Sequence, residues 1–256
     1  MKRIGVLVYG VLSYAVFFAT FLYAIGFVGN LLVPKSIDSP AEGSWLAALG
    51  MNLALLGVFA LQHSVMARPG FKRWWTRYVP EPMERSTYVL LSSLALVLLF
   101  WLWQPLGGQV WSIEHPLGRA AAYALFATGW LTVLVTTMLI NHFDLFGLRQ
   151  SWLYFRGQEY TPLGFITPGP YRIVRHPLYV GWLLAFWATP TMTVTHLVFA
   201  LTITAYILVA IRFEERDLVA FHAEYEAYRR RVPMLLPRWS RKRLVPERVA
   251  VEGTTR

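Results

Sequence analysis

The segment RHPLYVGW, residues 175–182, places an arginine, a histidine and a tyrosine at the start of a long apolar run. Arginine is permanently cationic, histidine titrates near neutral pH, and tyrosine carries a hydroxyl on an aromatic ring. Pro177 suits the first turn of a helix, where its missing N–H would be unpaired anyway. A second cluster, Arg212, Glu214 and Glu215, follows the same run, so ionisable groups flank both of its ends.

Polar residues also adjoin the other apolar segments. They form three groups, which are Gln62, His63 and Ser64; Glu84 and Arg85; and Asn141, His142 and Asp144. A single polar residue at a helix end is usually benign, because its side chain reaches the lipid headgroups. Several such groups at one membrane face instead indicate a site, since ionisable residues near membrane depth tend to line cavities.

The composition excludes several kinds of chemistry. The chain has no cysteine, which rules out disulfides, thiolate metal sites and a cysteine nucleophile. It has no H-E-x-x-H, Walker or G-x-G-x-x-G motif, and we expect no metal site. The segment QEYTPLGFITPGPY, residues 158–171, is rich in glycine and proline, which is typical of a shaped loop whose backbone can serve a ligand.

The elements that must position these residues are membrane helices. Of the 256 residues, 56% are hydrophobic and 15% are charged, well below the roughly 25% charged residues of soluble domains. Five apolar runs are long enough to cross a bilayer, which takes about 20 helical residues; they are residues 4–33, 45–66, 86–104, 120–140 and 178–211. The fifth is too long for one span and contains Pro190 within ATPTMT. It predicts a helical hairpin.

The distribution of positive charge predicts the orientation. Cytoplasmic loops of membrane proteins are rich in Lys and Arg. With the hairpin and a cytoplasmic N-terminus, 22 of the 24 Lys and Arg residues lie inside, and only Lys35 and Arg119 lie outside. The net charge of +10 is then explained by topology, and we expect no nucleic-acid partner. The sequence thus predicts an all-α integral membrane protein with both termini and a cofactor pocket on the cytoplasmic side.

The domain organisation follows from the same pattern. We expect one polytopic membrane domain over residues 1–237, with a cofactor-binding core at about residues 158–237. Residues 238–256 form a basic polar tail.

The ordered motifs RHPLY, EE and YEAYRRRVPMLLP resemble the isoprenylcysteine carboxyl methyltransferase superfamily of integral-membrane methyltransferases. The N-terminal segment LQHSVMARPGFKRWWTRYVPEPMERSTY and the segment DLFGLRQ are similar to its nurim-like branch, which includes bacterial methanethiol S-methyltransferases. The resemblance implies a pocket for S-adenosylmethionine (SAM). The positions that match the family's cofactor segments are Leu163, Gly164, Phe165, Ile166, Tyr171, His176, Pro177, Tyr179, Glu214, Glu215, Tyr225, Tyr228, Val232 and Pro233.

These residue types suit that cofactor. Glutamates accept hydrogen bonds from ribose hydroxyls or an ammonium group, and aromatic rings can flank adenine or face a sulfonium. The resemblance implies S-methylation of a small thiol, with methanethiol converted to dimethyl sulfide. Only a thiolate is a good nucleophile, so a base or a nearby positive charge is needed. His63, Asp144 and Arg212 are the candidates for this catalytic role.

Other functions stay open at this point. Members of the same superfamily methylate prenylated cysteine carboxyls and phospholipid amines. An NADPH-dependent sterol-type reductase has a similar C-terminal architecture, and Arg229–Arg231 would offer charge for its 2′-phosphate. A non-enzymatic nurim-like membrane scaffold is a further alternative, although a scaffold has no need of the RHPLY and EE motifs together. The expected partners are a small thiol and the lipid bilayer, and the oligomeric state is left open.

Overall fold

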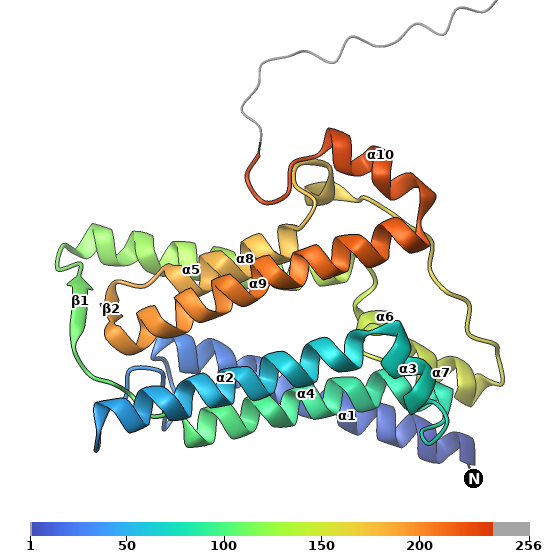
Figure 1. Ribbon diagram of the computed structural model, residues 1–256, viewed down its shortest axis with the longest axis horizontal. Helices are drawn as coiled ribbons and strands as arrows, with labels where there is room; N and C mark the ends of the chain where they lie inside the picture. Colours follow the sequence, from blue (N-terminus) through green and yellow to red (C-terminus); the bar gives the residue numbers. More distant parts are fainter. Residues whose placement is uncertain (1, 238–256) are drawn as a thin grey trace, which may run out of the picture.

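In the computed structural model, which describes residues 2–237, long helices run side by side and a two-stranded sheet closes one end (Figure 1). The elements in chain order are α1 (Lys2–Gly29), α2 (Trp45–Ala67), α3 (Pro69–Trp75), α4 (Glu81–Leu102), β1 (Gln109–Ser112), α5 (Pro116–Leu139), α6 (His142–Leu145), α7 (Leu148–Arg156), η1 (Gly169–Arg172), α8 (Pro177–Trp187), β2 (Thr191–Thr193), α9 (Val194–Phe221) and α10 (Ala223–Arg231). We call the two ends of the bundle the strand end, at β1 and β2, and the N-terminal end.

The membrane architecture predicted from the sequence is confirmed. Within residues 2–237, five helices are long and apolar enough to cross a bilayer, namely α1, α2, α4, α5 and α9. Large apolar side chains such as Trp101 and Leu131 are exposed on the outside of the bundle, as lipid-facing residues should be. The chain is therefore a multi-pass integral membrane protein. The predicted tail, residues 238–256, lies outside the described residues, and the limits of the cofactor core remain a prediction.

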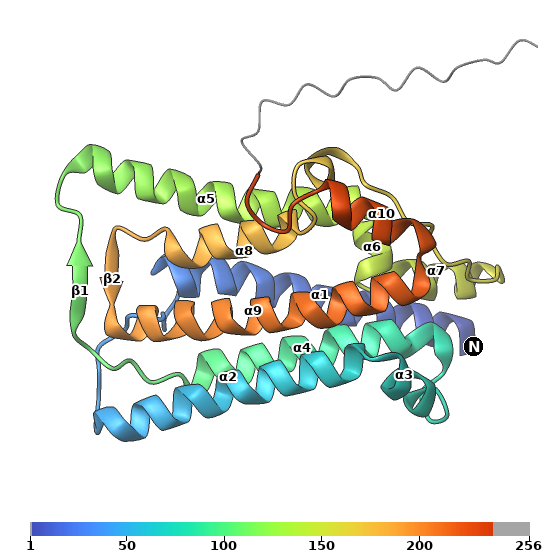
Figure 2. The ribbon, with the colours of Figure 1, turned by 45° about the horizontal axis from the view of Figure 1, so that its top comes forward.

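The helical hairpin is also present. α8 begins at Pro177, the chain turns at residues 188–193, and α9 returns beside α8 (Figure 2). α9 is longer than the apolar run, because it continues from Ile211 to Phe221. Glu214 and Glu215 therefore lie within the helix rather than beyond it. Arginine and glutamate favour helix, so the helix persists where its hydrophobicity ends.

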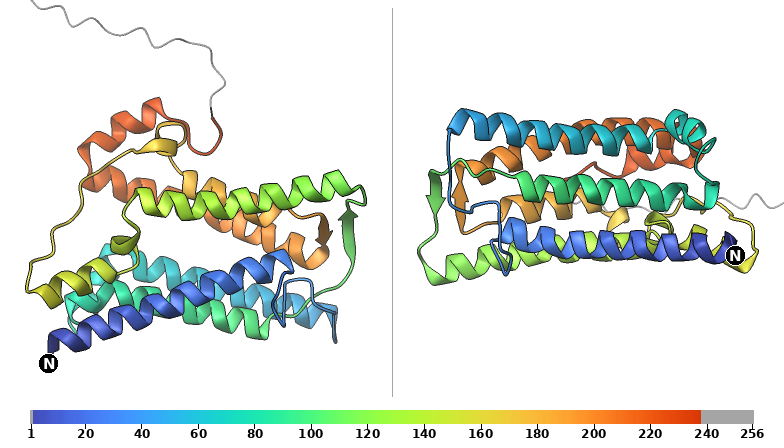
Figure 3. Two further views of the ribbon diagram at one scale, coloured as in Figure 1. Left: turned by 180° about the vertical axis from the view of Figure 1, so that it is seen from behind. Right: turned by 90° about the horizontal axis from the view of Figure 1, so that it is seen from below.

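The strand end is closed by backbone pairing. β1 pairs with β2 in antiparallel register, with Trp111 opposite Met192 and Ser112 opposite Thr191, and the pairing is irregular between Gln109 and Trp111. The sheet links the α4–α5 connection to the turn of the hairpin. The N-terminus, α3, α6, α7 and α10 all lie at the opposite end (Figure 3).

The hairpin is held in the bundle by a close crossing of α5 and α8. A Cβ atom on Gly129 would lie 2.5 Å from the backbone nitrogen of Ala185, and one on Gly181 would lie 2.9 Å from the Gly129 carbonyl oxygen. Small residues let helices approach this closely in membranes, where packing rather than water drives association. Because α8 begins at His176 and Pro177, this crossing also positions the residues described next.

Candidate active site

Glu215 on α9 is the centre of a cluster of hydrogen bonds at the N-terminal end. Its Oε1 accepts a hydrogen bond of 2.7 Å from Arg175 Nε and one of 3.0 Å from His176 Nε2. The Tyr225 hydroxyl donates to the same oxygen at 3.4 Å. The Arg175 and Glu215 side chains are only 11% and 12% exposed, so their ion pair is largely buried. An ionised carboxylate only accepts hydrogen bonds, which places the His176 proton on Nε2.

Glu214 faces the other side of the same histidine. The Tyr179 hydroxyl donates to Glu214 Oε2 at 2.8 Å, and His176 Nδ1 lies 4.0 Å from that oxygen. The Glu214 side chain is 43% exposed. Its second oxygen, Oε1, has no hydrogen-bond partner within residues 2–237. The two neighbouring carboxylates therefore differ in exposure, because Glu215 is held in a largely buried ion pair through Oε1, whereas Glu214 is partly exposed and can accept from a ligand.

Arg175 fastens the segment after α10 to the start of α8. Its Nη1 donates to the carbonyl oxygens of Arg229 at 3.0 Å and Val232 at 2.6 Å. Its backbone N–H donates to the Pro233 carbonyl at 2.8 Å, and that of His176 to the Met234 carbonyl at 3.2 Å. Arg175 was not among the predicted site residues, although it begins the RHPLY motif. Val232 and Pro233 take part in this cluster through their carbonyl groups.

Aromatic rings from the cofactor loop and from α10 pack against one another beside this cluster. The Tyr228 hydroxyl donates to the Tyr171 carbonyl at 2.5 Å. The Phe165 ring centroid lies 5.6 Å from that of Tyr225 and 5.5 Å from that of Tyr228. Burial raises the pKa of Tyr228 to about 12, and burial likewise raises the pKa of Tyr225. Both phenols therefore stay protonated at neutral pH and can donate hydrogen bonds.

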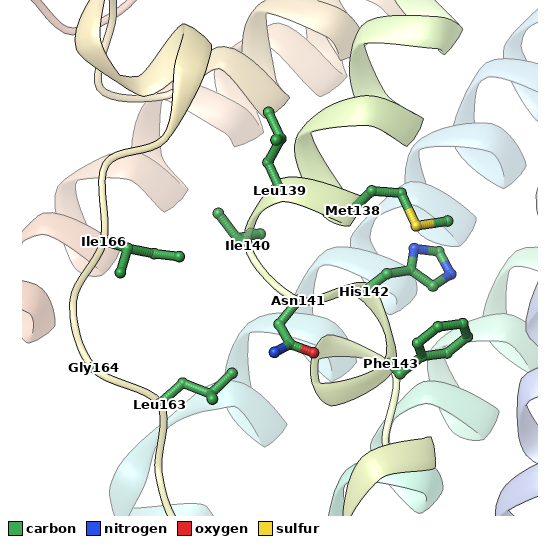
Figure 4. Close-up of a pocket in the computed structure, with 9 residues that line it drawn as sticks. All are labelled: Met138, Leu139, Ile140, Asn141, His142, Phe143, Leu163, Gly164 and Ile166. Atoms are coloured by element: carbon green, nitrogen blue, oxygen red, sulfur yellow. The ribbon is translucent and has the colours of Figure 1, made fainter.

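The other residues of the predicted cofactor loop line a hollow. Leu163, Gly164 and Ile166 face the turn between α5 and α6 across a cavity of about 380 Å³ (Figure 4). Asn141, in this turn, has the left-handed backbone angle φ 80°, which is uncommon outside glycine. The volume falls in the range of about 300–1,000 Å³ typical of small-molecule sites.

His63 is on α2 and faces α4. The Tyr88 hydroxyl is 3.0 Å from His63 Nδ1 and 2.9 Å from Nε2, and Ser92 Oγ is 3.3 Å from Nδ1. The ring stacks on Phe59 with centroids 5.2 Å apart. The imidazole is thus held by polar and aromatic partners.

Asp144 is held in an ion pair beside the cofactor loop. Its Oδ1 accepts from Arg149 Nη1 at 2.8 Å, and its Oδ2 accepts from the Tyr160 hydroxyl at 3.3 Å. Arg149 Nη1 also donates to the Thr161 carbonyl at 3.0 Å. Burial and the adjacent Asp144 carboxylate raise the pKa of Tyr160. These contacts fix Tyr160 and Thr161, which precede the loop residues that line the hollow.

Arg212 lies elsewhere, on an exposed face of α9. It lines a second cavity of about 350 Å³ together with Glu215, Arg216, Val219 and Arg229. The three predicted catalytic residues therefore occupy three different places. The predicted cofactor residues His176, Tyr179, Glu214, Glu215 and Tyr225 are brought together.

His142 is a further buried group that was not among the predicted catalytic residues. Thr137 Oγ1 donates to the Leu134 carbonyl at 2.8 Å, so toward His142 Nδ1, 3.0 Å away, it must accept. His142 Nδ1 thus carries the proton, and Nε2 accepts from the Tyr14 hydroxyl at 2.9 Å. Burial lowers the pKa of His142, which keeps the ring neutral. Its place in the sequence between Asn141 and Asp144 was the available signal.

Among the described residues, no group of three or more His, Cys, Asp or Glu side chains is arranged to hold a metal ion. The cluster instead offers an accepting carboxylate, imidazole and phenol groups, and the hollow lined by the cofactor loop. These groups suit a small organic cofactor with cationic and hydroxyl groups.

Comparison with known proteins finds one family model and several curated relatives that are similar to this chain. The model of the phospholipid methyltransferase family matches residues 117–223. The methanethiol S-methyltransferase of Crocosphaera subtropica is 61% identical over 238 residues, which is 93% of each chain. That of Mycobacterium tuberculosis is 56% identical over 93% of this chain and 98% of its own length. Nurim of Sus scrofa is 29% identical over 76% of this chain and 80% of its own. No solved structure matches.

Proposed function

The chain belongs to the family of the methanethiol S-methyltransferases, and we propose that it transfers a methyl group from SAM to methanethiol and releases dimethyl sulfide. The observation that carries the proposal is the extent of the match, since identity of 61% covers 93% of both chains. The phospholipid methyltransferase model begins only at residue 117 and leaves out α1, α2 and α4. The likeness to the thiol enzymes includes these helices, and it favours a thiol over a phospholipid amine.

The two glutamates have different roles in the proposed cofactor site. Glu214 has an oxygen with no partner among the described residues, so it accepts a hydrogen bond from the ammonium or a ribose hydroxyl of SAM. Glu215 is already bound by Arg175 and His176, so it is a positioning residue that holds the His176 ring. Phe165 and Tyr225 supply an aromatic surface next to Glu215. SAM, when bound, supplies an electrophilic methyl group on its sulfonium.

The thiol must lose its proton before it can attack. We propose that His63 takes the S–H proton; the thiolate would then accept the methyl group that bound SAM would supply, and the cofactor would leave as its demethylated thioether. Tyr88 and Ser92 hold the His63 ring for this role. Asp144 is neutralised by Arg149, so we propose that it shapes the loop.

We propose that both termini face the cytoplasm. Within residues 2–237, Lys35 and Arg119 are the Lys and Arg residues that belong to the strand end, while the others lie toward the N-terminal end. Such asymmetry follows the positive-inside rule. A reporter fused to the C-terminus should therefore read out as cytoplasmic, and a periplasmic signal would overturn the orientation.

Headspace gas chromatography tests the reaction directly. Membranes that contain the protein should form dimethyl sulfide from SAM and methanethiol, and membranes without it should not. The same membranes should leave a prenylated cysteine and phospholipid amines unmethylated. Transfer of labelled methyl groups to either of these, without dimethyl sulfide, would replace the proposal. Stabilisation of the purified protein by NADPH instead of SAM would indicate a reductase.

A further inference from the structure

Apart from Glu215, the residues that line the second cavity have no role in the methyl transfer proposed above. Its walls carry three arginines, Arg212, Arg216 and Arg229, and we call it the arginine hollow. Arg212 and Arg216 lie one turn apart on the exposed face of α9 and form no ion pair with residues 2–237. Arg229 comes from α10 and pairs with Glu226 at 3.1 Å.

The charge of the arginine hollow is positive. Glu215 is the acidic residue among its lining, and its carboxylate is already bound by Arg175 at 2.7 Å and by His176. Arginine guanidinium groups bind phosphate with two parallel hydrogen bonds and are less strongly hydrated than ammonium groups. Two arginines without a partner among the described residues and a compensated carboxylate therefore favour an anionic phosphate ligand.

An apolar strip leads away from the hollow along the same helix. Leu208 lies four residues before Arg212, and Leu201 lies seven residues before Leu208, so all three share one face of α9. Leu201 and Leu208 are 52% and 42% exposed. This face passes from apolar to cationic between Leu208 and Arg212, where the apolar run of α9 ends, and headgroups are expected at such a boundary. A phospholipid has the matching order of acyl chain and phosphate.

We propose that the arginine hollow binds the anionic headgroup of a membrane phospholipid, whose acyl chain lies along Leu201 and Leu208. The proposal does not depend on the methyl transfer reaction. The bound lipid contacts both α9 and α10 and so stabilises the packing of these two helices against each other. It lies next to Glu215 and to Arg229, whose carbonyl oxygen accepts from Arg175. Anionic lipid in the cytoplasmic leaflet would thereby stabilise the site.

The test compares the full-length protein in nanodiscs of phosphatidylcholine alone with nanodiscs that contain phosphatidylglycerol. Phosphatidylglycerol should raise the Tm of the parent by about 5 °C or more, as expected when a ligand binds only the folded state. Arg212→Gln/Arg216→Gln should lose most of this rise. The matched control, Arg73→Gln/Arg77→Gln, removes two exposed arginines from the α3 region of the same end and should keep it.

Native mass spectrometry provides a second readout. The parent should retain phosphatidylglycerol, and the double variant should lose it. Inorganic phosphate added to phosphatidylcholine nanodiscs should have no effect, whereas an equal rise in Tm would show a free-anion site instead. The proposal is overturned if parent and double variant respond alike, or if the control loses the response equally. Should the double variant fail to fold, Arg216→Gln alone is measured in its place.

Discussion

The two ends of the bundle are built from different interactions. At the strand end, the backbone of β1 pairs with that of β2, and side chains add hydrogen bonds to the backbone. The Asn52 side-chain amide, for example, donates to the Gln104 carbonyl at 2.6 Å and accepts from the Gln104 N–H at 2.9 Å. At the N-terminal end, ion pairs and hollows predominate. Glu215 joins α8, α9 and α10 through side chains rather than through a sheet.

The contrast assigns the strand end to holding the helices in place and the N-terminal end to ligand binding. The strand end fixes where α5, α8 and α9 begin or turn, so the opposite end can carry a long loop without regular structure. Residues 157–168 have no helix or strand, and Leu163 and Ile166 are 40% and 57% exposed. Segments with few buried contacts open most easily, as a site that admits a cofactor requires. The predictions below test whether the two ends act separately in this way.

The largest effect is expected at the carboxylate cluster. Glu215→Ala leaves Arg175 and His176 without their shared acceptor, and loss of one partner of a buried charged pair costs about 2–5 kcal/mol. The Kd for SAM or its demethylated product should rise by about 30-fold to several thousand-fold by calorimetry, which is the equivalent of that cost. Glu214→Ala should also weaken binding, while the exposed Glu224→Ala should not. A folded Glu215→Ala protein with the parent's Kd would contradict the assignment.

The next effect concerns the base. His63→Gln should lower kcat about 100-fold at low pH and leave the affinity for SAM unchanged, because a general base contributes to the reacting state. The deficit should shrink as pH rises, since more of the thiol then ionises without help. His115→Gln, at the strand end, is the control. An equal deficit at every pH would remove His63 from proton transfer and direct attention to His142.

The parts that could be predicted from sequence are those encoded locally. Apolar runs of sufficient length identified the spans, and Pro177 and Pro190 marked the start and the turn of the hairpin. The β1–β2 pairing was not predicted, because it joins two short segments about 80 residues apart. The end of α9 at Phe221 was missed because charge interrupts the apolar pattern before the helix ends.

At the candidate site, too, the sequence predicted local motifs but not contacts between distant segments. The motif resemblance selected His176, Tyr179, Glu214 and Glu215, which do lie together. It did not assign a role to Arg175, whose partners besides Glu215 are backbone carbonyls that have no sequence signature. Residue type alone could not choose among the catalytic candidates, since a histidine, an aspartate and an arginine each suit thiol activation. Their roles, like those of the cofactor residues, remain predictions.

A smaller effect is expected at the close crossing of α5 and α8, two helices that run between the ends of the bundle. Gly129→Ala places a Cβ 2.5 Å from the Ala185 backbone nitrogen and must push α8 away from α5. Overpacking of this kind costs about 1–3 kcal/mol. Because α8 carries His176, we expect a loss of about tenfold in kcat/KM, as misplaced groups react slowly. Gly57→Ala, which meets nothing within 4 Å, should match the parent. Equal behaviour of the two variants would show that the crossing does not position the site.

The smallest effect on function is expected at the strand end itself. Asp38 accepts a hydrogen bond from the Thr193 hydroxyl, and its Oδ2 lies 3.5 Å from His196 Nδ1. Burial raises the Asp38 pKa, but the contacts with His196 and Thr193 outweigh burial and lower it overall. The folded pKa is thus below the unfolded value of about 3.9, so the stabilisation is present above that pH and is lost as pH falls through the folded pKa.

Asp38→Asn should therefore lower Tm at neutral pH, by an amount equivalent to about 1–3 kcal/mol, because one accepting oxygen is lost near His196 and Thr193. The difference from the parent should narrow as pH falls below about 4, since the parent then protonates its own carboxyl. Glu42→Gln, an exposed change in the same loop, should leave Tm unaffected at both pH values. Throughout, the Kd for SAM at neutral pH should stay at the parent's value. A weaker Kd in Asp38→Asn would show that the two ends of the bundle are coupled.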